Sequence, residues 1–160
     1  MSYIRNVELS DAEVLVEIYR PYVENTTISF ECETPSVDEF RSRIENISKK
    51  YPYIVMLEDD EIVGYAYAGR FKGRKAYDWC VETTIYVRED KKGGGYGKKL
   101  YLELEKRLKK QNILNMYACI AYTDNEDEHL TNNSMQFHEH MGFRLIGTFK
   151  NVRLQVRQVV

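Results

Sequence analysis

Apolar residues recur along this chain with two different spacings, and the alternation between them predicts an α/β fold. Short apolar runs predict six strands, at Tyr3–Glu8, Tyr53–Glu58, Glu61–Ala68, Tyr77–Val87, Met116–Tyr122 and Phe143–Phe149. Helical spacing predicts two helices before the second strand, a third that buries Leu100, Leu104 and Leu108, and a last one at Thr131–Met141. The order of these elements predicts a mixed sheet flanked by helices.

Local signals place the ends of several elements. Ser10-Asp-Ala-Glu13 and Ser36-Val-Asp-Glu39 both have the spacing of a capping box, in which a serine and a glutamate cap the same helix start. Asp59-Asp60 separates two apolar runs and predicts a tight hairpin turn. No linker, repeat or low-complexity segment interrupts the pattern, so we expect a single domain over residues 1–160.

Composition agrees with one globular domain and excludes several function classes. The chain has 160 residues, of which 43% are hydrophobic, and its net charge of −2 provides no global field for nucleic acid or a membrane surface. No signal-peptide pattern and no apolar run of ~18 residues occur, so we expect a cytoplasmic protein. Cys32, Cys80 and Cys119 include no C-x-x-C pair, which argues for a reducing compartment and against a disulfide framework or a structural zinc.

A loop rich in glycine and lysine joins an apolar strand to an amphipathic helix within Val87–Leu100. Successive glycines allow backbone N–H groups to converge on one point, and the next helix presents its unpaired first-turn donors there, so a phosphate or pyrophosphate is the natural ligand. The loop fails the P-loop pattern, because Lys92 and Lys99 replace the first glycine and the Ser or Thr, and it lacks the last glycine of the dinucleotide fingerprint. A solvated glycine loop with a lysine run is the alternative.

Lys92-Gly-Gly-Gly-Tyr-Gly97 resembles the acetyl-CoA loop of the GNAT superfamily of N-acetyltransferases, with Lys92 as a departure at the first position. The resemblance covers most of the chain and points to the phosphinothricin acetyltransferase branch. It rests on motifs in the same order: Ile28–Glu31 with Thr34-Pro35, Arg74–Trp79, Val81–Val87 and Asn133–Phe143. The resemblance implies the GNAT acyl-CoA N-acyltransferase fold, with a mixed, mostly antiparallel twisted sheet flanked by helices. It also implies an acetyl-CoA-dependent N-acetyltransferase.

The resemblance also implies which residues bind acetyl-CoA and the acceptor amine. The implied cofactor-binding residues are Ile85, Tyr86, Val87, Lys92, Gly93, Gly94, Gly95, Tyr96, Gly97, Lys98, Asn133 and Ser134. The implied acceptor-binding residues are Phe30, Glu31, Arg74 and Tyr77. An arginine fork suits a carboxylate or phosphinate, and aromatic rings suit an apolar side chain, so we expect a small amino acid or analogue such as phosphinothricin or methionine sulfoximine. Arg74 could equally belong to a solvated basic loop.

Glu82 is the candidate general base. An acceptor amine must lose a proton as it attacks the thioester, and period-two alternation places Glu82 with Cys80, Thr84 and Tyr86 on one face of its strand. A carboxylate within an apolar strand is costly unless it is paired or functional, and the resemblance assigns it the base role, directly or through water. An ion pair or an edge carboxylate is the structural alternative.

His138 is the second catalytic candidate, because the resemblance places a histidine here near the thioester and the acceptor. A histidine with satisfied hydrogen bonds in a partial core is the alternative. His138 and His140 are two residues apart and cannot share one helical face, which argues against a two-histidine metal site. We expect no metal cofactor.

The chain departs from the resembling family at its end. Residues 150–160 lack the glycine and the aromatic run that precede the family's final strand, so we expect that strand to be missing or altered. A one-nucleotide shift in one possible coding sequence would restore such a run, and a shifted reading frame is therefore our preferred hypothesis over natural divergence.

These observations predict a homodimeric enzyme that transfers acetyl directly from acetyl-CoA to a small amine in a ternary complex. Three alternatives stay open. One is an acyl-cysteine intermediate on Cys80 or Cys119, another is a different amine acceptor, and the third is a non-catalytic acetyl-CoA-binding module.

Overall fold

The computed structural model describes residues 1–150, 154–155 and 158–159. Its helices and strands follow in the order β1 (Ser2–Asn6), η1 (Leu9–Asp11), α1 (Ala12–Glu24), α2 (Val37–Ser48), β2 (Tyr53–Glu58), β3 (Glu61–Arg70), η2 (Lys75–Tyr77), β4 (Cys80–Val87), η3 (Glu89–Lys91), α3 (Tyr96–Lys110), β5 (Asn115–Tyr117), α4 (Asn133–His140), β6 (Leu154–Gln155) and β7 (Gln158–Val159), where η marks a 3-10 helix. The chain forms two compact units, the first from Met1–Ile18 with Pro35–Cys119 and the second from Tyr19–Thr34 with Ile120–Val160.

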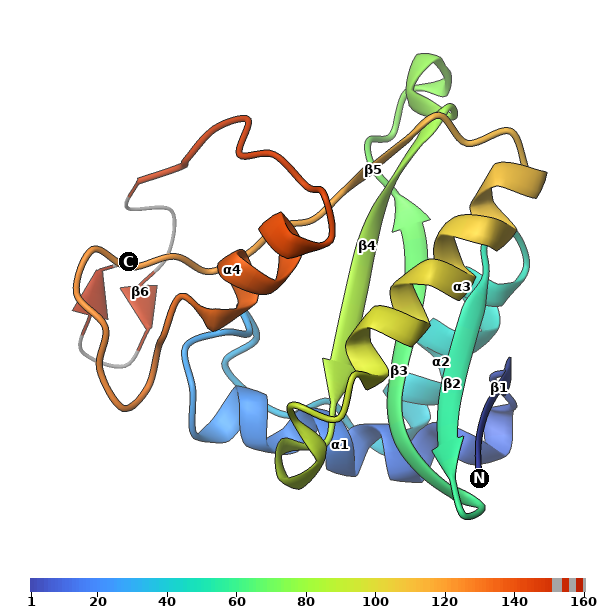
Figure 1. Cartoon of the computed structure of the whole chain (residues 1–160), viewed down its shortest axis with the longest axis horizontal. Helices are drawn as coiled ribbons and strands as arrows, with labels where there is room; N and C mark the ends of the chain where they lie inside the picture. The colour runs from blue at the N-terminus through green and yellow to red at the C-terminus, as the bar shows by residue number, and fades with distance from the viewer. Residues whose placement is uncertain (151–153, 156–157, 160) are drawn as a thin grey trace. The chain divides into compact units, whose positions relative to one another are not determined.

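The first unit is built on a five-stranded sheet in the order β1-β2-β3-β4-β5 (Figure 1). Neighbouring strands are antiparallel except β4 and β5, which run parallel. Only three residue pairs join those two strands, and the last of them is Glu82 with Tyr117. Among the described residues, β4 continues from Thr83 to Val87 without a strand partner on that side, so the sheet is forked at this edge.

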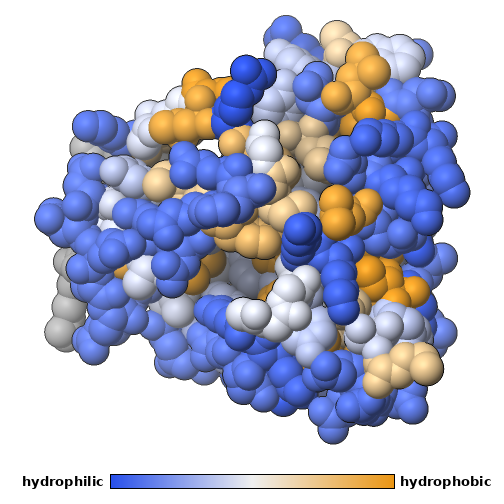
Figure 2. Space-filling view, viewed as in Figure 1, coloured by the Kyte–Doolittle hydropathy of each residue, from blue (hydrophilic) through white to orange (hydrophobic). Residues whose placement is uncertain are grey.

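Helix α3 covers one face of this sheet, in front of it in Figure 1. Its buried stripe consists of Tyr96, Leu100, Tyr101, Leu104 and Leu108. The Tyr101 hydroxyl lies 3.2 Å from Thr83 Oγ1, which fixes Thr83 and the buried Val81 on the α3 side of β4. The outer side of α3 carries ion pairs such as Glu103–Arg107 and Glu105–Lys109, and hydrophilic residues cover most of the face seen in Figure 2.

The opposite face of the sheet carries a row of tyrosine rings from three strands. Tyr53 of β2 stacks on Tyr67 of β3 at 4.6 Å between ring centroids, and Tyr65 of β3 lies 5.7 Å from Tyr86 of β4. Phe40 of α2 packs edge-on against Tyr65 at 6.1 Å, so α2 lies on this face. Side chains alternate along a strand, so residues two or four positions apart project to the same face. Glu82 therefore projects to the same face as Thr84 and Tyr86.

The second unit contains the end of α1, α4 and the pair β6–β7. The Thr27 amide donates to the His129 carbonyl at 3.1 Å, and His129 Nδ1 lies 3.3 Å from the Asn25 carbonyl. One main-chain contact and one side-chain contact therefore join the two segments of this unit. Strands β6 and β7 pair with each other in a separate antiparallel sheet. No helix in the described part of the chain has both the length and the apolarity that crossing a membrane requires.

The predicted α/β architecture is confirmed, but several element ends differ from the sequence-based expectation. The capping box lies at Glu8 and Asp11, not at Ser10, because the Glu8 amide donates to Asp11 Oδ2 at 2.8 Å. The box at Ser36 and Glu39 is confirmed. The turn at Asp59-Asp60 is also confirmed, and both residues adopt positive φ angles of 49° and 66°, as a tight hairpin requires.

Four expected strands are shorter or missing, and the first of them, β1, ends at Asn6 rather than at Glu8. β4 begins at Cys80 because Lys75–Tyr77 forms a 3-10 turn, and β5 ends at Tyr117. No strand forms over Phe143–Phe149, where Leu145, Ile146 and Phe149 are 70%, 81% and 84% exposed. In the atypical tail, residues 151–153, 156–157 and 160 lie outside the described residues. The described tail residues pair only with each other, in β6–β7.

Candidate active site

The glycine loop between η3 and α3 has the backbone conformation of an anion cradle. Gly93 and Gly95 adopt φ angles of 84° and 77°, which other residues rarely adopt. Gly95 is the N-cap of α3, and the Lys99 amide donates to the Gly95 carbonyl at 3.2 Å. The N–H groups of residues 95–98 therefore precede the first intrahelical hydrogen bond and are available to a ligand at the positive end of the helix dipole.

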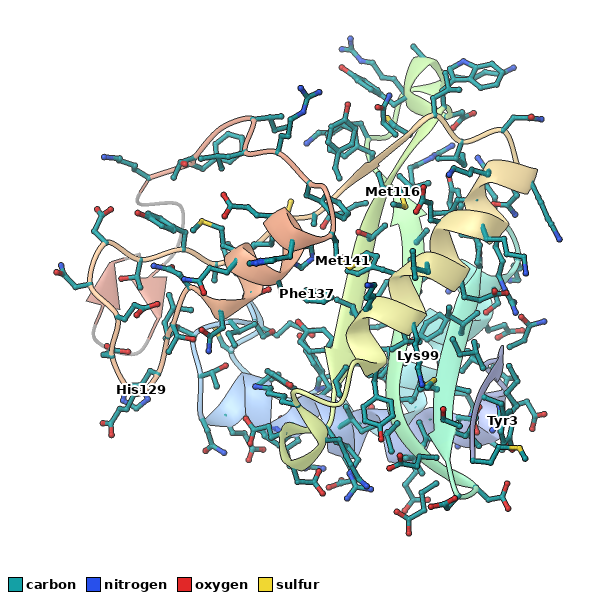
Figure 3. The ribbon with its side chains drawn as sticks, in the orientation of Figure 1. Tyr3, Lys99, Met116, His129, Phe137 and Met141 are labelled. Atoms are coloured by element: carbon teal, nitrogen blue, oxygen red, sulfur yellow. The ribbon has the colours of Figure 1, made fainter. Side chains whose placement is uncertain are left out.

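The side chains around this loop also favour an anion. The Lys98 side chain is exposed, and no carboxylate in the described part of the chain forms an ion pair with it. Lys99 is directed elsewhere, since its ammonium donates to Ser2 Oγ at 3.2 Å (Lys99 is labelled in Figure 3). A cation and unpaired amides at one helix start fit the pyrophosphate of acetyl-CoA. The predicted ligands at residues 92–98 thus lie on one continuous segment, formed by the glycine loop and the first turn of α3.

Ile85, Tyr86 and Val87, the other predicted cofactor residues of this unit, lie on the forked edge of β4. All three are half-buried, and β5 does not extend beside them. A forked edge leaves main-chain groups that an extended ligand can reach, as in strand addition. The fork therefore fits the linear pantetheine arm of acetyl-CoA, with the glycine loop at one end of β4.

Glu82 lies where the fork begins, on the half-buried face of β4. None of the Lys, Arg or His side chains that the structure describes forms an ion pair with it, so the ion-pair alternative has no support. Its neighbour is Cys119: partial desolvation, followed by the Glu82 carboxylate, raises the pKa of the Cys119 thiol. A raised thiol pKa argues against Cys119 as a nucleophile, because the thiolate is the reactive form.

An aromatic cluster lies beside Glu82 on the same face. Phe71 stacks on Tyr117 at 4.5 Å between ring centroids and meets Tyr77 edge-on at 6.0 Å. Sequence reasoning found Tyr77 but missed Phe71 and Tyr117, because only the register of β4 with β5 brings Tyr117 opposite Glu82. Together these rings form an apolar wall at the end of the sheet that carries Glu82.

Arg74 and Trp79 border this cluster on the segment before β4. The Arg74 side chain is exposed, and no described carboxylate forms an ion pair with its guanidinium. Trp79 is 60% exposed, while its carbonyl accepts a hydrogen bond from the Leu114 amide at 2.8 Å. The backbone here is thus anchored while the guanidinium remains available to an anion.

The predicted acceptor residues Phe30 and Glu31 belong to the second unit, whereas Arg74 and Tyr77 belong to the first. Phe30 is 59% exposed. Glu31 is held by a chain of hydrogen bonds: the Tyr19 hydroxyl donates to Glu31 Oε2 at 2.6 Å and contacts Ser29 Oγ, which accepts from the Glu31 amide at 3.1 Å. The Glu31 carboxylate therefore has a fixed orientation within its unit.

His138 on α4 is almost fully buried, at 4% exposure. Its Nδ1 lies 2.6 Å from the Ser134 carbonyl, which can only accept, so Nδ1 carries the hydrogen and the neutral ring leaves Nε2 unprotonated. Burial lowers the pKa of His138, against the opposing effect of this hydrogen bond. Phe137, labelled in Figure 3, and Phe143 both meet the ring edge-on. The His138 ring thus combines an unprotonated nitrogen with tight aromatic packing.

Asn133 and Ser134, the last predicted cofactor residues, form the first turn of α4 in the second unit. Asn133 is exposed and Ser134 is half-buried. The neighbouring Asn132 is engaged within the unit, because its side-chain amide exchanges two hydrogen bonds with the Thr123 main chain, at 3.2 and 2.9 Å.

The three cysteines are free thiols, and Cys32 and Cys119 are exposed. Among the described residues, no group of His, Cys, Asp or Glu side chains could hold a metal ion.

Comparison with known proteins shows the family of this chain. Residues 4–156 match the model of the acetyltransferase (GNAT) domain family. The chain is 31% identical to a phosphinothricin N-acetyltransferase of Streptomyces viridochromogenes, over 92% of this chain and 76% of that protein. It is 28% identical to an L-methionine sulfoximine/L-methionine sulfone acetyltransferase of Pseudomonas paraeruginosa, over 93% of this chain and 84% of that protein.

A solved structure shares the fold. The GNAT superfamily phosphinothricin acetyltransferase of Sinorhizobium meliloti, crystallised with acetyl-CoA, superposes with a TM-score of 0.90 at 31% identity, and the match covers 99% of this chain and 83% of that one. These matches support acetyl-CoA as the co-substrate of this chain. The chain belongs to the GNAT family, in its phosphinothricin acetyltransferase-like branch, and is an acetyl-CoA-dependent N-acetyltransferase.

Proposed function

We propose that this enzyme acetylates the amino group of a small amino acid or analogue, with Glu82 as general base. The observation that carries the proposal is the position of Glu82, a half-buried carboxylate without a cationic partner among the described residues, at the start of the β4–β5 fork. Bound acetyl-CoA supplies the activated acetyl thioester. Glu82 accepts the proton that the acceptor amine must lose, directly or through water.

The acceptor class is inferred from the side chains near Glu82 and from the relatives. The exposed Arg74 guanidinium suits a carboxylate or phosphinate, and the rings of Phe71, Tyr77 and Tyr117 suit a short apolar side chain. The two relatives described above are named for phosphinothricin and for methionine sulfoximine or sulfone. Both names denote amino-acid analogues, which supports an acceptor of that size and charge. In the second unit, Phe30 and Glu31 are further acceptor-binding candidates, and His138 is the second candidate base.

The geometry also supports direct transfer in a ternary complex over an acyl-cysteine route. The Cys119 thiol has a raised pKa, and the Cys80 thiol donates to the Tyr77 carbonyl at 3.2 Å, which engages it as a donor. The raised pKa argues against a thiolate at Cys119, and the thiolate is the nucleophilic form. Initial-rate patterns should therefore be sequential, and a ping-pong pattern would favour the cysteine route.

A thiol-release assay over a panel of amines tests the proposal. Acetyl-CoA is offered with phosphinothricin, methionine sulfoximine, methionine sulfone, the common amino acids and a lysine-containing peptide. Because Cys32 and Cys119 are exposed, each rate needs an enzyme-only blank, and mass spectrometry should confirm the acetylated product. Turnover with amino acids or their analogues supports the proposal. Turnover with the peptide alone would overturn the acceptor class, and acetyl-CoA binding without turnover of any amine would leave a binding module.

We also propose a homodimer. The support is the exposure of three large apolar side chains, Leu145, Ile146 and Phe149, on one short segment of the second unit, because exposed apolar surface can mark a protein–protein contact. Light scattering coupled to size exclusion measures the mass directly. A monomer at micromolar concentration would refute this part of the proposal.

A further inference from the structure

The two ends of the glycine loop hydrogen bond to the same carboxylate. Glu58, the last residue of β2, accepts a hydrogen bond from Lys91 Nζ at 2.8 Å through Oε2 and one from the Tyr96 hydroxyl through Oε1. Lys91 precedes the glycines, and Tyr96 is the first residue of α3. The two bonds therefore bracket the loop and tie it to the sheet.

Tyr96 reaches Glu58 because its ring folds back over Gly94. A Cβ atom on residue 94 would lie 2.4 Å from Cε2 and 3.0 Å from Cδ2 of this ring, so any side chain there would have to displace the ring. Gly93 and Gly95 meet no such obstacle, and their positive φ angles explain them instead. Glycine is therefore required for two different reasons. Gly93 and Gly95 adopt left-handed φ angles, and Gly94 leaves room for the Tyr96 ring.

Charge also favours this arrangement. The hydrogen bond from Lys91, followed by that from Tyr96, lowers the pKa of Glu58, and Glu58 in turn raises the pKa of Lys91. The pair is therefore fully ionised near neutral pH, and the Lys91 ammonium is directed to Glu58. Lys91 is then part of the support of the loop, while Lys98 is the cation available to the ligand.

We infer that Glu58 is a positioning residue for the acetyl-CoA loop: it holds Lys91 and Tyr96 so that the amides of residues 95–98 converge before the ligand arrives. The inference rests on the assignment of this loop to the pyrophosphate. Glycine loses more conformational freedom on ordering than any other residue, and three glycines in succession make this loop costly to fix. A clamp that fixes the loop in the free enzyme removes that cost from binding.

Glu58 also has a charge effect, which acts on acetyl-CoA binding in the opposite direction to positioning. Its carboxylate also places a negative charge near the expected phosphate site and engages a lysine that could otherwise bind there. That charge effect would make removal of Glu58 strengthen binding, and it would fade as salt increases. The positioning effect has the opposite sign and depends little on salt, so measurements at low and high ionic strength separate the two.

Three variants test the inference. Glu58→Gln removes the charge and weakens both bonds, whereas Tyr96→Phe removes one bond and leaves the ring on Gly94. Glu61→Gln is the matched control, since Glu61 is a nearby carboxylate that pairs with Arg88 at 3.2 Å and does not bracket the loop. Melting temperatures show whether each variant folds, and the Tyr96→Phe variant keeps the test decisive if Glu58→Gln is unstable.

The readouts are the Kd for acetyl-CoA, the KM for each substrate, kcat, and kcat/KM with S-acetylpantetheine, which lacks the pyrophosphate. We expect Glu58→Gln to raise the Kd and the KM for acetyl-CoA about tenfold at both salt concentrations, because a charged hydrogen bond contributes on that order. Tyr96→Phe should have a smaller effect, and the double variant should be non-additive. Glu58→Gln should leave kcat, the acceptor KM and the rate with S-acetylpantetheine unchanged.

Two outcomes would overturn the inference. One is an unchanged or tighter Kd in both variants, and the other is an equal loss with S-acetylpantetheine, which would indicate general damage. A Gly97→Asp variant distinguishes failure of the inference from failure of the loop assignment. If Gly97→Asp weakens acetyl-CoA binding while Glu58→Gln does not, the loop assignment holds and the clamp is refuted. If neither variant weakens binding, the pyrophosphate lies elsewhere, and the inference falls with the assignment.

Discussion

Glu82 of β4 lies opposite Tyr117 of β5, in the last residue pair that joins the two strands. Thr83, the next residue, turns to the other face, where its hydroxyl lies 3.3 Å from the Tyr117 carbonyl and 3.2 Å from the Tyr101 hydroxyl. The fork therefore opens beside a position that Thr83 fixes from the α3 side of the sheet. The proposed base, Glu82, would keep its place while a ligand occupies the open edge beyond it.

Replacing Glu82 by glutamine should reduce kcat by on the order of 10²–10⁴-fold, the usual cost of losing a general base. The Kd for acetyl-CoA should hardly change, because the loop is at the other end of β4. The acidic limb of the pH–rate profile should disappear as well. Steady-state kinetics over a pH series measure both effects, and Glu89→Gln, an exposed carboxylate on η3, is the control. Turnover like that of the parent at every pH would show that another residue is the base, and His138 would be tested first.

Substitutions in the glycine loop should separate stability from affinity. Gly97→Asp introduces an acidic residue in the first turn of α3, which favours the helix dipole but repels a pyrophosphate. We expect an unchanged or higher melting temperature and a clearly weaker Kd for acetyl-CoA. Gly95→Ala should cost about 1–2 kcal/mol of stability, because its φ of 77° is left-handed. If Gly97→Asp binds acetyl-CoA as tightly as the parent, the cradle is not the pyrophosphate site.

Buried His138 should make the protein less stable in mild acid. Its folded-state pKa lies below the ordinary value of 6.5, so the unfolded chain binds a proton first and stability falls as the pH drops below 6.5 toward the folded-state pKa. The loss is bounded at about 1.4 kcal/mol for each pH unit between the two values. Urea unfolding at pH 7.5 and 5.5 should show a smaller acid loss in His138→Gln than in the parent. His140→Gln, in which an exposed ring is replaced, should follow the parent.

The ion pair between Arg5 and Asp11 should contribute measurably to stability. Two guanidinium nitrogens of Arg5 donate to the buried Asp11 carboxylate at 2.8 and 2.9 Å, and the Glu8 amide adds a third bond. Burial raises the pKa of Asp11, but the bonds from Arg5 and Glu8 outweigh it and hold the pKa below 3.8. Its contribution is therefore present above pH 3.8 and is lost as the pH falls through the lower folded-state value.

Asp11→Asn should cost about 2 kcal/mol at pH 7, since hydrogen bonds to charged groups contribute on that order. Thermal or urea unfolding measures the difference. Asp38→Asn is the control, because the Asp38–Arg41 pair is exposed and such pairs contribute little. Equal effects of the two substitutions would show that the network at the start of α1 has no special role.

The sequence predicted those features that depend on short-range patterns. The hairpin at Asp59-Asp60 and the helix that follows Ser36 each have a signal within four residues, and both are confirmed. The family motif placed the glycine loop before α3 correctly. The box at Ser10 was wrong because an identical spacing at Glu8 and Asp11 gains Arg5 as a partner, and that contact comes from a neighbouring strand.

Long-range relationships could not be predicted from the sequence. Glu58 is 33 residues from Lys91 and 38 from Tyr96, so no periodicity connects them. Tyr117 joins Glu82 only through the register of β5, which is three residues long and shorter than its apolar run suggested. The apolar pattern of Phe143–Phe149 predicted a strand, but a strand also requires a neighbour with free main-chain groups, and none pairs with it in the described part of the chain.

Trp79 has a practical consequence for spectroscopy. It is the only tryptophan of the chain, and it lies directly before β4, three positions before Glu82. Excitation that is selective for indole will therefore report on the end of the sheet that carries the proposed base. A side chain already 60% exposed changes its surroundings little on unfolding, but a bound acceptor would shield it from water. Tryptophan emission should thus follow acceptor binding without a label, while it would be a poor signal for denaturation.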